Sequence, residues 1–247
     1  VSLPRHGKLE RLGGSVITTA PATLAQGGNQ VVYRPDSGWT GEDSFTFRAD
    51  DGGVAPFGGP SNVAKVSISV VNEVELVYKV AAGDDDAHAN RWSSLQRPGE
   101  PSLAIGQYTA GMRFCGVEVP QGAEIIRATL RICAHSEGIC GWIAAALYAE
   151  AADNPGSFTS EHRVSTLTMT TASQDWSWDS VVWQANAWYE SPDISSVIQE
   201  VIDRPGWSPG NALVIAYVVS DSGAYNRRFW AYEGSPSKAA ELVIVYR

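Results

Sequence analysis

The chain has 247 residues, of which 44% are hydrophobic and only 18% charged, and it contains 24 Gly and 13 Pro. This composition excludes a disordered chain and favours a folded, turn-rich β protein. The formal net charge of −9 repels phosphate, so we expect no nucleic acid partner. The chain contains no stretch of 18 apolar residues, so we predict no segment that inserts into a membrane.

Short strands with alternating polarity are predicted in the first part of the chain. Phe45 and Phe47 alternate with polar residues, which places both rings on one face of a strand. Segments rich in Gly, Pro and Asp separate the strands, as is typical of a β-sandwich. The predicted strands cover residues 15–19, 30–33, 43–49 and 64–71.

The same segment carries a motif made of three separate stretches. It consists of LPRHGKL at residues 3–9, VYRPDSGWTGEDSFTFRADDG at residues 32–52 and AKVSISV at residues 64–70. This pattern resembles the cadherin-like or immunoglobulin-like tandem repeats of large bacterial surface proteins. The resemblance implies an immunoglobulin-like sandwich over residues 1–72 that is truncated at its N-terminal side, because the repeats usually have one or two further opening strands. Residues 73–76 are then expected to be a short boundary.

A second, larger all-β segment is expected to follow. Its predicted strands cover residues 75–82, 112–119, 125–133, 143–150, 212–220, 228–232 and 241–246, and several are continuously apolar. Such strands suit the interior of two stacked sheets, and a jelly-roll sandwich of about eight strands is the natural architecture.

One short amphipathic helix is predicted within this segment, at about residues 194–203. Its apolar stripe consists of Ile194, Val197, Ile198, Val201 and Ile202. Asp193 can cap the helix, or Ser191 can do so with Pro192 at the first helical position. We expect the helix to brace one end of the sandwich rather than to carry chemistry.

Residues 77–247 resemble the C-terminal jelly-roll modules of large secreted bacterial proteins, especially planctomycete ones. The matching stretches are DDDA at residues 84–87, MRFCGVEVPQGAEIIRATL at 112–130, the helix region at 191–207, AYEGSP at 231–236 and LVIVY at 242–246. These modules are similar to those named after disaggregatase and the DNRLRE signature, some of which bind carbohydrate beside polysaccharide-degrading enzymes. The resemblance implies an extracellular or cell-surface bacterial protein.

Tryptophans are the best functional indication, because nine Trp are many for this length. Trp176 and Trp178 alternate along a predicted strand, which would place both rings on one face as an exposed platform for sugar. Trp188, Asp175 and Asp179 are its expected companions, while Trp92, Trp142 and Trp230 remain undecided candidates. Trp183 and Trp207 are expected in the core.

Three further groups of residues are candidates for metal binding or cross-linking. The run of Asp84, Asp85 and Asp86 suits a structural calcium ion, with a solvated acidic loop as the alternative. Asp50 and Asp51 are weaker calcium candidates, since Asp-Gly also forms turns. Cys133 and Cys140 flank a short loop that a disulfide would close in an oxidising compartment; the alternative is that these two and Cys115 are buried thiols.

The sequence carries no recognised catalytic motif. We therefore expect a non-catalytic extracellular module that binds polysaccharide through exposed tryptophans and holds a structural calcium. The first alternative is an architectural role as a spacer in an adhesin, filament or surface layer, with another protein chain as the partner. The second is a part of a polysaccharide-degrading enzyme, which would require two carboxylates facing each other in a cleft.

Overall fold

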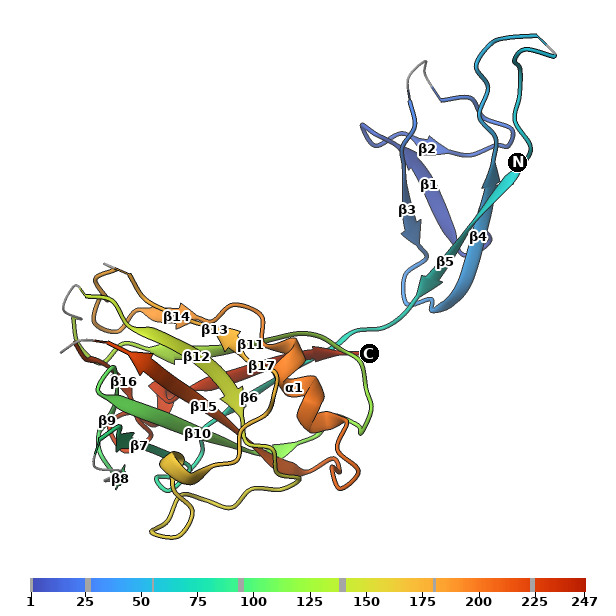
Figure 1. Ribbon diagram of the computed structural model, residues 1–247. Helices are drawn as coiled ribbons and strands as arrows, with labels where there is room; N and C mark the ends of the chain where they lie inside the picture. Colours follow the sequence, from blue (N-terminus) through green and yellow to red (C-terminus); the bar gives the residue numbers. More distant parts are fainter. Residues whose placement is uncertain are drawn as a thin grey trace. The chain divides into compact units, whose positions relative to one another are not determined.

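The computed structural model describes residues 2–24, 28–54, 56–92, 96–137, 141–179, 181–222 and 225–247. The chain divides into two compact units, Val1–Asn72 and Glu73–Arg247, here called unit 1 and unit 2 (Figure 1). Strands make up most of the regular structure in both units, and α1 (Ser195–Ile202) is the one α-helix among the described residues. The expected all-β class is therefore confirmed.

Unit 1 consists of two small antiparallel sheets. One has the order β2-β1-β3, and the other is a pair of β4 and β5. Leu9 and Ile17 are its buried apolar side chains among the described residues, while inward residues of β5 are only half-buried. The strands are β1 (Gly7–Arg11), β2 (Val16–Ile17), β3 (Val31–Pro35), β4 (Gly41–Phe47) and β5 (Ala64–Val70).

Residues of the three-part motif of unit 1 contact one another in a small polar cluster. The ring of His6 stacks on Trp39 with centroids 4.4 Å apart. Asp43 accepts hydrogen bonds from the backbone N–H of Arg5 and of His6, both at 2.9 Å, and from the Tyr33 hydroxyl at 3.0 Å. Burial alone would raise the pKa of Asp43, but these hydrogen bonds outweigh it and lower the pKa to about 2. Motif residues far apart in the sequence thus hold one another in place.

Unit 2 contains a six-stranded sheet of order β13-β12-β15-β10-β7-β8 and a four-stranded sheet of order β14-β11-β17-β6, with β16 and β9 paired separately (Figure 1). β6 begins at Val74, inside the boundary predicted at residues 73–76, because Val74 already pairs with Tyr246 of β17. The strands are β6 (Val74–Lys79), β7 (Asp86–Asn90), β8 (Gln96–Pro98), β9 (Ser102–Ile105), β10 (Tyr108–Val117), β11 (Ile125–Cys133), β12 (Ala144–Ala149), β13 (Gln174–Asp175), β14 (Trp188–Glu190), β15 (Asn211–Asp221), β16 (Arg227–Trp230) and β17 (Glu241–Tyr246).

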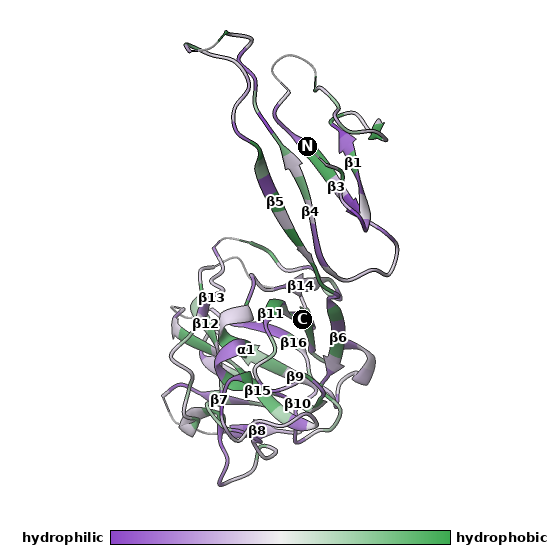
Figure 2. Ribbon diagram, turned by 90° about the vertical axis from the view of Figure 1, so that its right-hand side faces the viewer, coloured by the Kyte–Doolittle hydropathy of each residue, from purple (hydrophilic) through white to green (hydrophobic). Residues whose placement is uncertain are grey.

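The main core of unit 2 lies between the inner faces of its sheets. Alternate residues of each strand point inward, as in β15, where Leu213, Ile215 and Tyr217 join the core cluster. Figure 2 shows hydrophobic residues concentrated in strands such as β10 and β15, with hydrophilic residues in many connecting loops. This arrangement is the one expected of two packed sheets.

The helix α1 braces unit 2 as predicted. All five residues of its apolar stripe are fully buried, and the helix packs against β11 and β12. Asp193 Oδ1 accepts the backbone N–H groups of Ser195, at 3.0 Å, and of Ala128, at 2.9 Å, so one carboxylate ties the start of the helix to β11. No helix in the described part of the chain is long and apolar enough to cross a membrane.

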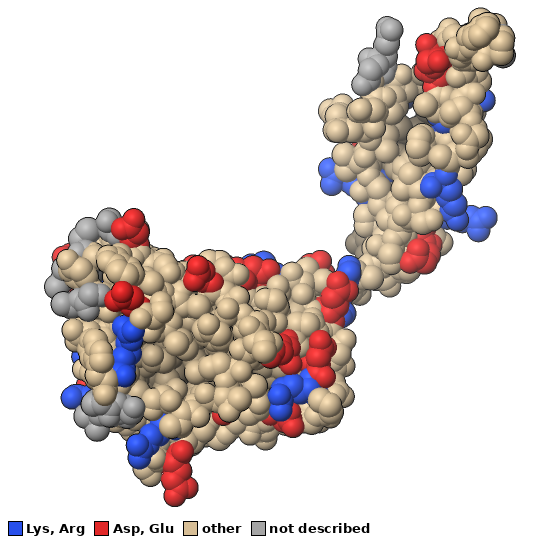
Figure 3. Space-filling model, viewed as in Figure 1, with Lys and Arg blue, Asp and Glu red and all other residues tan. Residues whose placement is uncertain are grey.

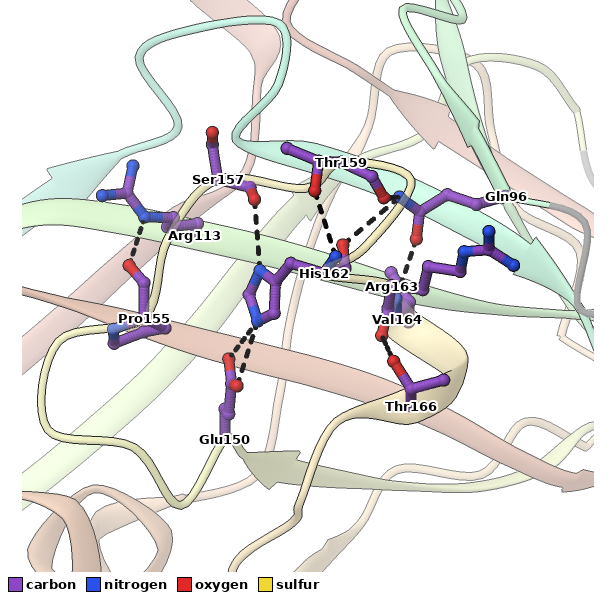
Figure 4. A network of polar contacts seen from close by, with 10 residues as sticks. All are labelled: Gln96, Arg113, Glu150, Pro155, Ser157, Thr159, His162, Arg163, Val164 and Thr166. Carbon is purple, nitrogen blue, oxygen red and sulfur yellow. Dashed lines mark hydrogen bonds and ion pairs between the residues drawn. The ribbon is translucent and has the colours of Figure 1, made fainter.

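The loop between β12 and β13 covers part of the outer face of the six-stranded sheet. His162 Nε2 lies 3.0 Å from each carboxylate oxygen of Glu150, and its Nδ1 lies 3.1 Å from the carbonyl oxygen of Ser157 (Figure 4). Both ring nitrogens therefore face oxygen atoms of the loop and of Glu150, and these contacts fix the orientation of the ring. The loop places Phe158 and Val164 in a second apolar cluster with Ala87, Ala89 and Val214 of the sheet.

Candidate functional site

The candidate site lies at the β12–β13 edge of the six-stranded sheet. Ile143 and Trp178 form an antiparallel bridge beyond the named strands, with both backbone hydrogen bonds at 2.8 Å. The same register pairs Ala146 with Asp175. It therefore places Trp142 opposite Asp179 on the outer face, since side chains alternate along a strand.

An open groove of about 380 Å³ lies at this edge. The exposed fraction of Trp142 is 46%, and the neighbouring Asp179 and Ser177 are also exposed. The Ser177 hydroxyl accepts the backbone N–H of Ala145 at 3.1 Å, which fixes its position in the groove. The residues that line the groove are Trp142, Ile143, Ala144, Ser177, Trp178 and Asp179.

Packing inside the sandwich holds the wall of the groove rigid. The half-buried ring of Trp178 meets Trp183 edge-on at a centroid distance of 5.0 Å and Tyr189 at 5.6 Å. The guanidinium of Arg227 lies 5.2 Å from the centroid of the same ring. Trp183 is fully buried, as predicted, and so is almost all of Trp207. A rigid aromatic wall needs little reorganisation when a ligand binds.

The predicted platform of Trp176 and Trp178 is wrong. The two rings do share one face of the chain, but that face is the inner one, so Trp176 is only 5% exposed. Their ring planes are tilted by 46° rather than coplanar. The Tyr217 hydroxyl donates a hydrogen bond to the carbonyl oxygen of Trp176, which further fixes this segment against β15. Alternation predicts which residues share a face, whereas the direction of that face depends on the whole sheet.

A second exposed ring lies beside the groove. Tyr225 is 39% exposed, and its ring lies so close to Gly141 that a Cβ at residue 141 would come within 2.4 Å of it. The Tyr225 ring therefore lies against the residue that directly precedes Trp142 in the chain. Sequence reasoning missed Tyr225, since nothing in the local pattern relates it to residues more than 80 positions away.

The remaining tryptophan candidates lie at separate places on unit 2. Trp92, 66% exposed, follows β7 and has the Arg91 guanidinium 5.8 Å from its ring centroid. Trp188 belongs to the four-stranded sheet and lies beneath Arg131. The Nε1–H of Trp230 donates to Asn186 at 3.2 Å, and Lys238 lies over its ring. The structure thus does not gather these three rings into one surface with Trp142.

The three consecutive aspartates at the start of β7 do not converge. Asp84 is exposed, Asp85 pairs with Arg113 at 2.5 Å on the outer face, and Asp86 is buried on the inner side. Strand alternation separates their carboxylates. Among the described residues no group of three or more His, Cys, Asp and Glu is placed to hold a metal ion, and calcium stays a proposal.

Asp50 and Asp51 form a turn, the reading that the sequence favoured. Asp51 Oδ1 accepts the backbone N–H of Gly59 at 2.6 Å and of Gly53 at 2.8 Å. These two hydrogen bonds lower the pKa of the Asp51 carboxyl. Asp50 Oδ1 similarly accepts the N–H of Gly52. Both carboxylates therefore stabilise the backbone between β4 and β5.

The predicted disulfide stays a prediction. Cys133 is buried at the end of β11, whereas Cys140 lies outside the described residues. Cys115 is exposed, and its sulfur lies 3.5 Å from Asp85 Oδ2.

No protein-family model and no curated protein matches this chain. One solved structure, described as belonging to work on "carbohydrate-binding modules from the beta-sandwich super family", is similar with a TM-score of 0.27 and 10% identity. The alignment covers 99% of this chain and 84% of that one. A TM-score this low carries no argument, so we infer function from the residues of the groove.

Proposed function

We propose that unit 2 binds polysaccharide, with a sugar ring packed on Trp142. The observation that carries this proposal is the half-exposed Trp142 ring at an open groove whose wall is the rigid Trp178. An indole face offers a large amphipathic area to the C–H surface of a sugar ring. Ser177 and Asp179 supply polar groups beside it, and a few such groups in an aromatic groove are typical of ligand sites.

The proposed activity is binding without catalysis. Hydrolysis of a glycosidic bond generally uses two carboxyl groups on opposite sides of that bond. The described lining of the groove contributes one carboxylate, that of Asp179. We further propose an extracellular or cell-surface location, which is supported by the resemblance of both segments to secreted surface proteins.

The binding proposal is tested by pull-down of the full chain with insoluble polysaccharides and by affinity gels that contain soluble ones. We expect retention by at least one polysaccharide and loss of retention in Trp142→Ala. Trp92→Ala is the control, because it removes an even more exposed indole that does not line the groove. Retention by no polysaccharide, or equal retention of both variants, would contradict the proposal.

A second candidate function, attachment to another protein chain, is favoured by a separate surface of unit 1. The connection between β4 and β5 presents Phe57, 96% exposed, and Val54, 82% exposed. Exposed apolar side chains that lie close together often mark a protein contact. If this role holds, sedimentation velocity should show self-association of the full chain that the double substitution Val54→Ser and Phe57→Ser abolishes. A monomer at every concentration would count against self-attachment through this surface.

A further inference from the structure

Asp86 in β7 carries a buried carboxylate oxygen that the fold leaves unsatisfied. The residue is only 2% exposed. Its Oδ2 accepts the backbone N–H of Tyr232 at 2.9 Å, whereas its Oδ1 has no hydrogen-bond partner among the described residues. An isolated buried carboxylate oxygen is costly, and folded proteins normally satisfy such groups with a donor or a cation.

A second carboxylate lies beside it. Glu233 follows Tyr232, and its side chain lies against the backbone of Gly83, where a Cβ would come within 1.7 Å of Glu233 Oε1. Burial raises the pKa of Asp86 to about 7, and the charges of Glu233 and Asp85 add to that effect. Glu233 is exposed, so one side of the pair is open to solvent. The absence of a side chain at residue 83 creates the room that the Glu233 carboxylate occupies.

Other charged groups near Asp86 do not satisfy its Oδ1. The Asp85 carboxylate faces the opposite side of β7 and is paired with Arg113. His88 lies two residues further along β7, but burial and the Arg228 charge lower its pKa to about 4, and its Nδ1 already accepts the N–H of Ala104. The Arg228 charge near His88 opposes a cation there. Of the two carboxylates whose charges act on Asp86, Glu233 is therefore the one that can share a ligand with it.

We propose that Asp86 Oδ1 and the Glu233 carboxylate bind one divalent cation of the calcium type. Two carboxylate groups and nearby backbone or water oxygens are the ligands that this hard cation prefers. The cation would satisfy the orphan oxygen and cancel the repulsion between the two carboxylates. This site differs from a cluster of three consecutive aspartates, because only Asp86 of that run contributes. It is independent of the sugar-binding groove.

The test measures thermal unfolding of the full chain by tryptophan fluorescence at pH 8, after treatment with EDTA and its removal. Addition of 10 mM CaCl2 should raise the melting temperature of unit 2 by about 5 °C, if the dissociation constant is about 10⁻⁴ M as in extracellular modules. Choline chloride at equal ionic strength should not. MgCl2 tests selectivity, and we expect a smaller shift with it.

Variants separate the proposed pair from the acidic run. Asp86→Asn and Glu233→Gln should each abolish the calcium shift, whatever their own melting temperatures, whereas Asp84→Asn removes a neighbouring exposed charge and should retain it. Calorimetric titration with CaCl2 should show heat of binding for the wild-type chain and for Asp84→Asn only. No calcium shift in the wild type, or a shift that survives in Asp86→Asn or Glu233→Gln, would overturn the proposal.

Discussion

Replacing Asp86 by Asn should make the stability of unit 2 less dependent on pH. Burial, with the Glu233 and Asp85 charges, raises the pKa of Asp86 to about 7, against a value of 3.8 for the free side chain. Well below pH 4 the carboxyl group is protonated and neutral in both the folded and the unfolded chain, so burial of Asp86 does not lower the free energy of unfolding. Between pH 4 and 7 the unfolded chain ionises while the folded chain keeps its proton, so the free energy of unfolding falls as the pH rises.

The size of this effect follows from the shift. A difference of about three pKa units corresponds to about 4 kcal/mol, because one unit is worth about 1.4 kcal/mol. Asn keeps an oxygen to accept the Tyr232 N–H and carries no charge. In EDTA, Asp86→Asn should therefore match the wild type within about 1 kcal/mol at pH 4 and exceed it by up to about 4 kcal/mol at pH 8.

Urea unfolding followed by tryptophan fluorescence measures this difference, because every Trp except Trp39 belongs to unit 2. The wild type and Asp86→Asn are compared at each pH, so that all other titrating groups cancel. If the difference in unfolding free energy between the two chains stays constant from pH 4 to pH 8, Asp86 is not a buried carboxyl group with a raised pKa.

Two further predictions concern loop anchoring and acid stability. Glu150→Gln removes the charge that faces His162, so limited proteolysis within residues 151–168 should become several-fold faster, while the urea midpoint of unit 2 changes little; an unchanged cleavage rate would contradict this role. Asp43 has a pKa lowered to about 2, so its stabilisation of unit 1 is present above pH 4 and is lost as the pH falls toward 2. The protection factors for hydrogen exchange in residues 41–47, which correct for the pH dependence of intrinsic exchange, should fall on that descent and should already be low at pH 6 in Asp43→Asn; protection that is equal in the two chains at pH 6 would contradict this role.

Local patterns predicted the elements that bury one clear face. The apolar stripe from Ile194 to Ile202 predicted both the helix α1 and its buried face, because an amphipathic helix turns its apolar stripe toward the core. Trp183 and Trp207 were likewise expected in the core and are buried there. In unit 1 the motif that contains His6, Trp39 and Asp43 was visible in the sequence, whereas the stacking of His6 on Trp39 and the hydrogen bond from the His6 N–H to Asp43 required the structure.

The site was harder to predict because it depends on pairing between distant segments. Trp176 and Trp178 were correctly assigned to one face, yet the pairing of Trp178 with Ile143 turns that face inward. The same pairing moves Trp142, which the sequence left undecided, to the outer face opposite Asp179. In the acidic run, strand alternation sends Asp85 and Asp86 to opposite sides.

Charged groups of both signs are spread over the surface of unit 2. On the face shown in Figure 3, Lys and Arg groups of unit 2 stand apart among acidic and uncharged groups. Salt bridges pair several of these charges on the four-stranded sheet, including Arg131 with Glu241 at 2.8 Å and Lys79 with Glu241 at 3.0 Å. Exposed pairs of this kind contribute little stability.

The central claim, that a sugar ring packs on Trp142, is tested most directly by calorimetric titration of an oligosaccharide from the retained polysaccharide. A ligand that covers roughly 100 Å² of the indole would gain about 2.5 kcal/mol from it, or somewhat less than a hundredfold in affinity. Trp142→Ala should therefore weaken binding at least tenfold, while Trp92→Ala stays within twofold of the wild type. Unchanged affinity in Trp142→Ala would contradict the claim.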